Sequence, residues 1–106
     1  MKTIYRIEDK KGKSCYNFQY AEALDVLIGK EWDKTFSHRP PPQCDQGINR
    51  RMWHKEICGF KNVRQTLKWF SASEIRKMRR LGLDIKKVKV QKITAIGKCQ
   101  ILAIRG

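Results

Sequence analysis

The sequence predicts a small α+β domain in which an antiparallel sheet of about four to five strands packs against two to three helices. Strand-like residues lie near both ends of the chain, and apolar residues at helical spacing lie between them. A length of 106 residues with 41% apolar side chains suits one hydrophobic core. We therefore expect residues 1–106 to form a single domain with a long proline-containing loop at about residues 30–51.

The N-terminal segment predicts a hairpin-like start. Residues 3–8 are rich in β-branched and aromatic types and predict a strand. The polar segment 9–13 contains Gly12 and predicts a turn. Residues 15–18 then predict a short return strand.

A helix and a loop follow this start. Apolar residues at helical spacing over residues 20–29 predict a helix that ends at Gly29. No periodicity is visible between residues 30 and 51, where Pro40, Pro41 and Pro42 favour extended backbone. Long ordered loops are often functional, so this segment is of interest.

Two capping motifs predict consecutive helices in the second half. Asn62 with Gln65 predicts one N-terminus, and Val63, Leu67 and Phe70 then share one face. The next helix begins with a second capping motif, Ser71 with Glu74. Its predicted buried positions lie three residues apart, at Ile75, Met78 and Leu81, and Gly82 is placed to end it.

The C-terminal third predicts three strands. Residues 85–90 alternate between valine and lysine, residues 92–96 form a second strand, and Gly97-Lys98 forms a tight turn. Residues 99–104 are apolar on both faces, which places this strand centrally in the sheet.

The charge indicates a polyanionic partner. Lys and Arg total 24 against 10 Asp and Glu, a net charge of +14, and residues 74–106 hold ten of the basic and two of the acidic residues. Self-repulsion at this charge falls when phosphates neutralise it. A generally solubilising surface is the alternative interpretation. No segment has the length of a membrane span, so we expect a cytoplasmic protein with no membrane partner.

The candidate contacts to a nucleic acid or other partner are basic and aromatic. The basic residues on the predicted helix and strand, with two from the loop, are Arg76, Lys77, Arg79, Arg80, Lys86, Lys87, Lys89, Arg50 and Arg51. Trp32 and Phe36, four residues apart and flanked by cations, are the candidates for base stacking if they are exposed. No motif for sequence-specific recognition accompanies these residues.

A metal site is considered and not predicted. A helix at residues 54–58 would place His54 and Cys58 on one face, and His38 and Cys44 would complete four ligands. Zinc sites usually show tighter ligand pairs, and the apolar neighbours of these residues suggest ordinary packing. No CxxC pair is present, and free thiols are expected in a reducing compartment. We predict no cofactor and no catalytic residues.

Several short motifs resemble a family of small proteins encoded by bacteriophages and prophages. The matching elements run along most of the chain and are Tyr5-Arg6-x-Glu8, His38-x-x-Pro41 followed by Asp45, Cys58-Gly59-Phe60, Trp69-Phe70 and Gly97-x-x-Gln100. The resemblance implies a phage protein that acts in a bacterial host cell.

The order of elements also faintly resembles a trimmed ADP-ribosyltransferase fold. That resemblance implies that Arg6 would match a dinucleotide-binding arginine, whereas the late strand lacks the catalytic glutamate of that fold. Arg6, His38, Asp45 and Gln100 remain candidates for a polar pocket. In the alternative, Arg6 pairs with Glu8 or Asp45, while His38 and Gln100 bond local backbone.

Together these features predict a small basic phage accessory protein that binds nucleic acid or a host nucleoprotein. Inhibition of a host defence complex, as an anti-CRISPR does, would suit its size and charge. One alternative is an enzyme or NAD-binding protein related to ADP-ribosyltransferases. Another is a zinc-stabilised interaction module. The oligomeric state is not predicted.

Overall fold

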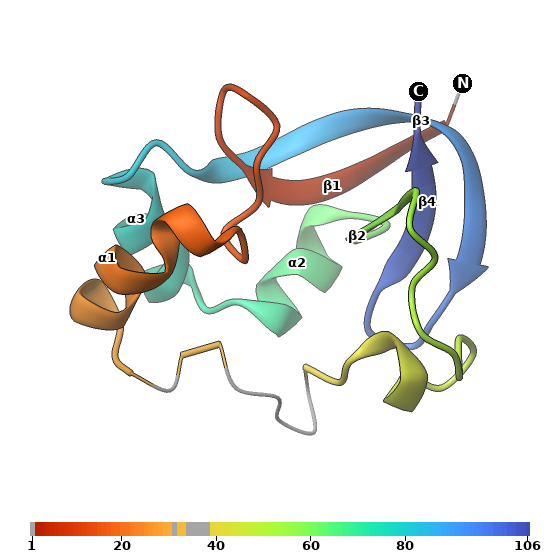
Figure 1. Ribbon diagram of the computed structural model, residues 1–106, viewed down its shortest axis with the longest axis horizontal. Helices are drawn as coiled ribbons and strands as arrows, with labels where there is room; N and C mark the ends of the chain where they lie inside the picture. The colour runs from red at the N-terminus through yellow and green to blue at the C-terminus, as the bar shows by residue number, and fades with distance from the viewer. Residues whose placement is uncertain (1, 31, 34–38) are drawn as a thin grey trace.

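The computed structural model describes residues 2–30, 32–33 and 39–106, and its α+β architecture agrees with the predicted class. Its helices and strands, in chain order, are β1 (Lys2–Glu8), α1 (Ala21–Leu27), β2 (Glu56–Gly59), α2 (Val63–Trp69), α3 (Ala72–Arg79), β3 (Asp84–Ile96) and β4 (Ile101–Arg105) (Figure 1). Short 3-10 turns are η1 (Phe18–Tyr20) and η2 (Pro42–Cys44). No helix within the described ranges has the length and apolar character needed to cross a bilayer.

In the described residues, the sheet is antiparallel with the strand order β1-β3-β4-β2. Strand β4 is internal, as the apolar character of its two faces predicted. The sheet curls until its edge strands meet, because Tyr5 and Phe60 exchange two backbone hydrogen bonds of 2.7 Å each. Gly59 permits this closure, since a Cβ there would lie 2.7 Å from the Tyr5 carbonyl oxygen.

The curled sheet encloses one apolar cluster of its own. Its buried members come from β1, β3 and β4 and are Ile4, Val88, Val90, Ile101 and Ala103. No helical residue belongs to this cluster, so the inner face of the sheet supplies its own core.

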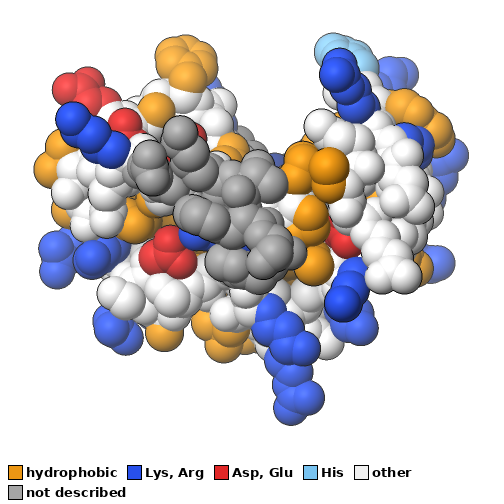
Figure 2. All heavy atoms as spheres, turned by 90° about the horizontal axis from the view of Figure 1, so that it is seen from below, with side chains coloured by type: hydrophobic (Ala, Val, Ile, Leu, Met, Phe, Trp, Pro, Cys, Tyr) orange, Lys and Arg blue, Asp and Glu red, His pale blue; other side chains and the backbone are white. Residues whose placement is uncertain are grey.

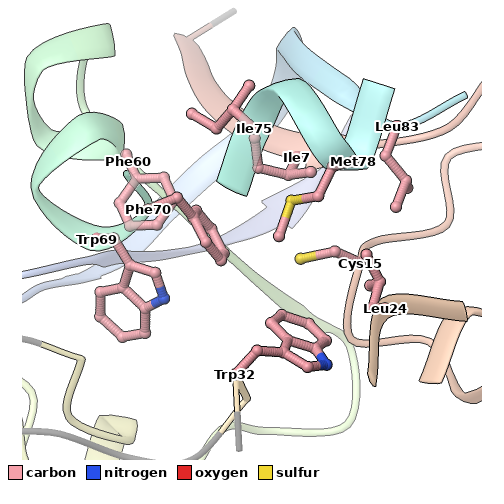
Figure 3. Close-up of a cluster of buried hydrophobic side chains, with 10 residues drawn as sticks. All are labelled: Ile7, Cys15, Leu24, Trp32, Phe60, Trp69, Phe70, Ile75, Met78 and Leu83. Atoms are coloured by element: carbon pink, nitrogen blue, oxygen red, sulfur yellow. The ribbon is translucent and has the colours of Figure 1, made fainter. Parts of the chain in front are cut away.

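A second apolar cluster joins the outside of the sheet to the helices (Figure 3). Its buried members are Ile7, Cys15, Leu24, Trp32, Phe60, Trp69, Phe70, Ile75, Met78 and Leu83. Phe60 packs on Trp69 with ring centroids 5.5 Å apart, and edge-on against Phe70 at 6.3 Å. This aromatic group fixes α2 and the start of α3 against the sheet.

Two of the predicted C-terminal strands are one strand. Residues 84–96 run as β3 without a break, and the register against β4 shifts between Val90 and Lys92 and again between Ile93 and Ala95. Such irregularities interrupt the alternation of side chains. The first half of β3 pairs with β1 and the second half with β4, so one long strand serves both neighbours.

The N-terminal half contains further differences from the sequence-based expectations. The helix over residues 20–29 is confirmed as α1, and the strand over residues 3–8 as β1. Residues 15–18 do not form a return strand, because Ser14 makes only an isolated bridge with Glu8 before the chain turns into η1. Strand β2 was not predicted at all.

Helix α2 packs through a different face from the predicted one. Its cap is confirmed, since the Asn62 side chain accepts from the Gln65 amide at 2.8 Å. However, Val63 and Leu67 are 42% and 46% exposed, whereas Gln65 and Thr66 are buried. The capping box of α3, Ser71 with Glu74, is confirmed in both directions.

Candidate nucleic-acid interface

The predicted basic helix is present, but one of its cations is paired. In α3 and its C-cap, Arg76, Arg79 and Arg80 are exposed and Lys77 is half-buried. The Arg79 Nε donates to the Asp84 carboxylate at 2.8 Å. This pair is exposed on both sides, so it is weak, yet it reduces the positive potential at the end of the helix.

The lysines of β3 do not continue that helix as one surface, which corrects the sequence-based expectation. The register opposes Lys86 to Arg6, Lys87 to Tyr5 and Lys89 to Thr3. Because side chains alternate along a strand, Lys86 points to the opposite face of the sheet from Lys87 and Lys89. On the face seen in Figure 2, Lys and Arg side chains are likewise spread around the rim and are not gathered in one patch.

Arg50 already has a structural partner. Its two terminal nitrogens donate to the two oxygens of Glu56 at 2.8 Å each, and its guanidinium lies 3.7 Å from the ring centroid of the exposed Trp53. The hydrogen bonds from Arg50 lower the pKa of Glu56 to about 2. Burial raises this pKa, but a hydrogen bond from Thr94 lowers it further. The neighbouring Arg51 is exposed.

The proposed stacking residues do not lie on a described surface. Trp32 is 5% exposed and stacks on Tyr16, with ring centroids 5.5 Å apart. Its ring is therefore part of the core, which corrects its assignment as a base-stacking candidate. Phe36 falls outside the described residues.

A more concentrated basic feature lies between α2 and the turn that joins β3 to β4. A hollow of about 280 Å³, called the cationic hollow below, is lined by Lys61, Asn62, Arg64, Gln65, Lys68 and Lys98. Arg64 and Lys68 are four residues apart on α2, and the spacing of Lys61 before them places it at the N-terminal end of the same side of the helix.

Hydrogen bonds hold the two walls of the cationic hollow together. The Gln65 side chain accepts from the Lys61 amide at 2.8 Å and donates to the Lys98 carbonyl at 3.3 Å. The Lys98 amide donates to the Gln46 carbonyl at 2.8 Å. A single buried glutamine therefore fixes both the start of α2 and the turn that carries Lys98.

Among the described residues, the cations of the hollow form no ion pair with a carboxylate. Within the described ranges, the side chains of Lys61, Arg64, Lys68 and Lys98 make no hydrogen bond or ion pair, and all four residues are exposed. Like charges around a hollow repel one another and concentrate the positive field there. A bound anion relieves that repulsion. Sequence reasoning missed this set, although the spacing of Lys61, Arg64 and Lys68 was visible; Lys98 reaches it only through the tertiary fold.

The expected polar pocket is divided. Arg6 and Gln100 line one small cavity of about 20 Å³. The Arg6 guanidinium is occupied, since it donates to the Cys58 carbonyl at 2.8 Å and to Glu8 at 2.7 Å. Asp45 does not line this cavity, although its carboxylate accepts a hydrogen bond from the Gln100 amide, and His38 is outside the described residues. The Arg6–Glu8 pair matches the alternative interpretation of these residues.

Asp45 anchors the loop to the sheet. Its buried carboxylate accepts from the Cys99 amide at 3.2 Å and from the Gln100 amide at 3.1 Å. The Gln100 side chain donates to the Pro40 carbonyl at 2.8 Å. The described part of the loop thus supports the turn that carries Lys98.

The cysteines and His54 do not converge. Across residues 2–30, 32–33 and 39–106, no group of three or more His, Cys, Asp and Glu side chains is placed to hold a metal ion. His54 lies in a turn and Cys58 on β2, so the helical spacing considered for them does not apply. Burial raises the pKa values of the Cys15 and Cys58 thiols, which keeps both neutral near pH 7.

The fold and this hollow define a small α+β protein with a concentrated cationic site whose cations form no ion pair in the part of the chain that the structure describes. The family comparison adds its origin. The chain belongs to the Bacteriophage T4 Y00F protein family, whose model matches residues 1–105. It is therefore a phage protein, in agreement with the resemblance to small phage-encoded proteins. No curated protein and no solved structure matches the chain.

Proposed function

We propose that this phage protein binds the phosphate backbone of a nucleic acid through the cationic hollow. The observation that carries the proposal is a group of four cations around one hollow, Lys61, Arg64, Lys68 and Lys98, which form no ion pair with any described residue. Lysine and arginine that contact phosphates release condensed counterions, which drives binding without regard to sequence.

A salt titration with matched variants tests the proposal. Binding of a labelled duplex DNA, a single-stranded DNA and an RNA of equal length is followed by fluorescence anisotropy at several salt concentrations. One triple variant removes charge from the hollow, and a control removes the same charge from an exposed turn: Lys61→Gln with Arg64→Gln and Lys68→Gln, against Lys10→Gln with Lys11→Gln and Lys13→Gln.

The two triple variants have the same net charge, so only the location of the lost charge differs. The hollow variant should bind at least about tenfold more weakly, and its slope of log K against log salt should fall by about two to three. The control should stay near the wild type. Equal losses in both variants would show that net charge alone drives binding and would contradict a localised site.

In the finer form of this proposal, the protein acts in the cytoplasm of the bacterial host and inhibits a host defence nucleoprotein. Its small size and dense positive charge support that role, because such a complex presents nucleic acid at its surface. Expression of the chain in a host with an active CRISPR system should restore plating of a targeted phage. Unchanged plating would contradict the inhibition of a host defence complex. Binding to the phosphate backbone would still be tested by the salt titration.

A further inference from the structure

Helix α2 exposes a second, apolar stripe beside its basic one. Val63 and Leu67 are four residues apart, and both are more than two-fifths exposed. The core side of the same helix is occupied by Gln65 and Thr66, which are satisfied by hydrogen bonds. The apolar stripe thus contributes little to the core, although exposure of apolar surface to water is unfavourable.

This stripe lines a groove. An open hollow of about 260 Å³ lies between α2, α3 and β3, and it is lined by Val63, Leu67, Ala72, Ile75, Arg76, Arg79 and Ile85. Its floor is apolar, with Ile75 buried and Ile85 half-buried. Among the described residues, the charged members of its lining are Arg76 and Arg79, both from α3.

The positive charge at the groove favours an acidic partner. The carboxylates nearest in sequence, Glu74 and Asp84, are both engaged: Glu74 caps α3 and contacts Arg39, and Asp84 accepts from Arg79. Arg76 is exposed and makes no ion pair within the described residues. A second copy of this chain, at a charge of +14, would be repelled.

We propose that this groove docks an acidic amphipathic segment of a partner protein. Apolar side chains of the segment would cover Val63, Leu67 and Ile75, and its carboxylates would meet Arg76 and the free side of Arg79. An amphipathic helix with apolar residues at i, i+3, i+4 and i+7 has this chemistry. The proposal is independent of the cationic hollow, since it uses the other exposed stripe of α2.

A synthetic helical peptide is the direct probe. A peptide of about 18 residues carries leucine at those positions and glutamate on its other face. A scrambled peptide of the same composition and a version with lysine in place of glutamate are the controls. Amide chemical-shift changes in the ¹⁵N-labelled protein report where each peptide binds.

The acidic amphipathic peptide should bind saturably and shift the amides of Val63, Leu67 and Ile75. Leu67→Ser should weaken binding about five- to tenfold, because Leu67 would lose the apolar surface that docking covers. Arg76→Gln should weaken binding and reduce its salt dependence. Val26→Ser is the matched control, since Val26 is an exposed apolar residue on α1 that does not line the groove, and it should leave affinity unchanged.

Several outcomes would overturn the proposal. These are equal binding of the scrambled or lysine peptide, shifts confined to other residues, or an equal effect of Val26→Ser. Self-association that Leu67→Ser abolishes would assign the groove to a second copy instead. An oligonucleotide that shifts the groove amides would assign it to nucleic acid. If the triple variant of the cationic hollow bound nucleic acid as well as the wild type did, the proposed function would be contradicted but the peptide test would still stand.

Discussion

Disruption of the packing of Asp45 against Gly97 should show how much this anchor of the loop on the β3–β4 turn contributes to stability. A Cβ on Gly97 would lie 2.4 Å from Asp45 Oδ2 and 2.8 Å from Ile48 Cδ1. Gly97→Ala must therefore displace the carboxylate from the amides of Cys99 and Gln100. Hydrogen bonds to a charged group contribute about 1.5–3 kcal/mol each, and the two are partly redundant, so we expect a loss of about 2–4 kcal/mol.

A double-mutant cycle tests whether both residues act through the same event. Asp45→Ala should also cost about 2–4 kcal/mol, but the double variant should be less destabilised than the sum by about 1–3 kcal/mol, because the clash is absent once the carboxylate is gone. Urea unfolding followed by tryptophan fluorescence measures each free energy of unfolding. Ser71→Ala, which shares no hydrogen-bond partner with Gly97, is the additive control. Additivity of Asp45→Ala and Gly97→Ala within about 0.5 kcal/mol would refute the reasoning.

Three further predictions concern stability. The pKa of Glu56 is about 2 in the folded protein against an ordinary value of 4.5. The ionised carboxylate therefore stabilises the fold above pH 4.5, and this contribution is lost as the pH falls toward 2. Glu56→Gln should flatten that part of the stability–pH curve in acid titrations followed by circular dichroism. Phe70→Ala should cost about 3–5 kcal/mol in urea unfolding, whereas Leu67→Ala, on the exposed face, should cost less than about 1 kcal/mol. Ser71→Ala should lower the free energy of unfolding by about 1 kcal/mol by removing the cap, and a change below about 0.3 kcal/mol would argue against the capping box.

The sequence predicted elements whose signals are local. The Ser71–Glu74 capping box, the helix before Gly29 and the apolar strand β4 were all found, because each depends on a few neighbouring residues. The class of the fold followed from their order. By contrast, β2 has four residues and a buried glutamate, Glu56, whose charge is met by Arg50. Its strand character depends on pairing with β4, which periodicity does not reveal.

Strand β3 shows a second limit of pattern reading. Its register shifts near Val90 and Ile93 disturb the period of two, so residues 85–90 and 92–96 resembled two separate strands. A separate error affected the functional expectation. The lysines of β3 were treated as one surface, whereas the continuous pairing with β1 sends Lys86 to one face and Lys87 with Lys89 to the other.

The position of the cationic hollow was not predicted from the sequence. The excess of basic residues indicated an anionic partner, but the count does not say which cations are neutralised. Arg79 and Arg50 form ion pairs, whereas Arg64 and Lys68 form none with the residues that the structure describes. Lys98 joins them only because Gln65 holds the β3–β4 turn against α2.

Helix α2 uses different faces for folding and for the binding that we propose. Its inward face is fixed by the rings of Trp69 and Phe60 and by the hydrogen bonds of Gln65, so stability depends on those residues. Its outward face holds a basic stripe and an apolar stripe that the core does not use. Substitutions at Arg64 or Leu67 should therefore weaken the proposed binding at little cost in the free energy of unfolding. If Val63 and Leu67 instead packed into the core of this domain, substitution of Leu67 would destabilise the fold.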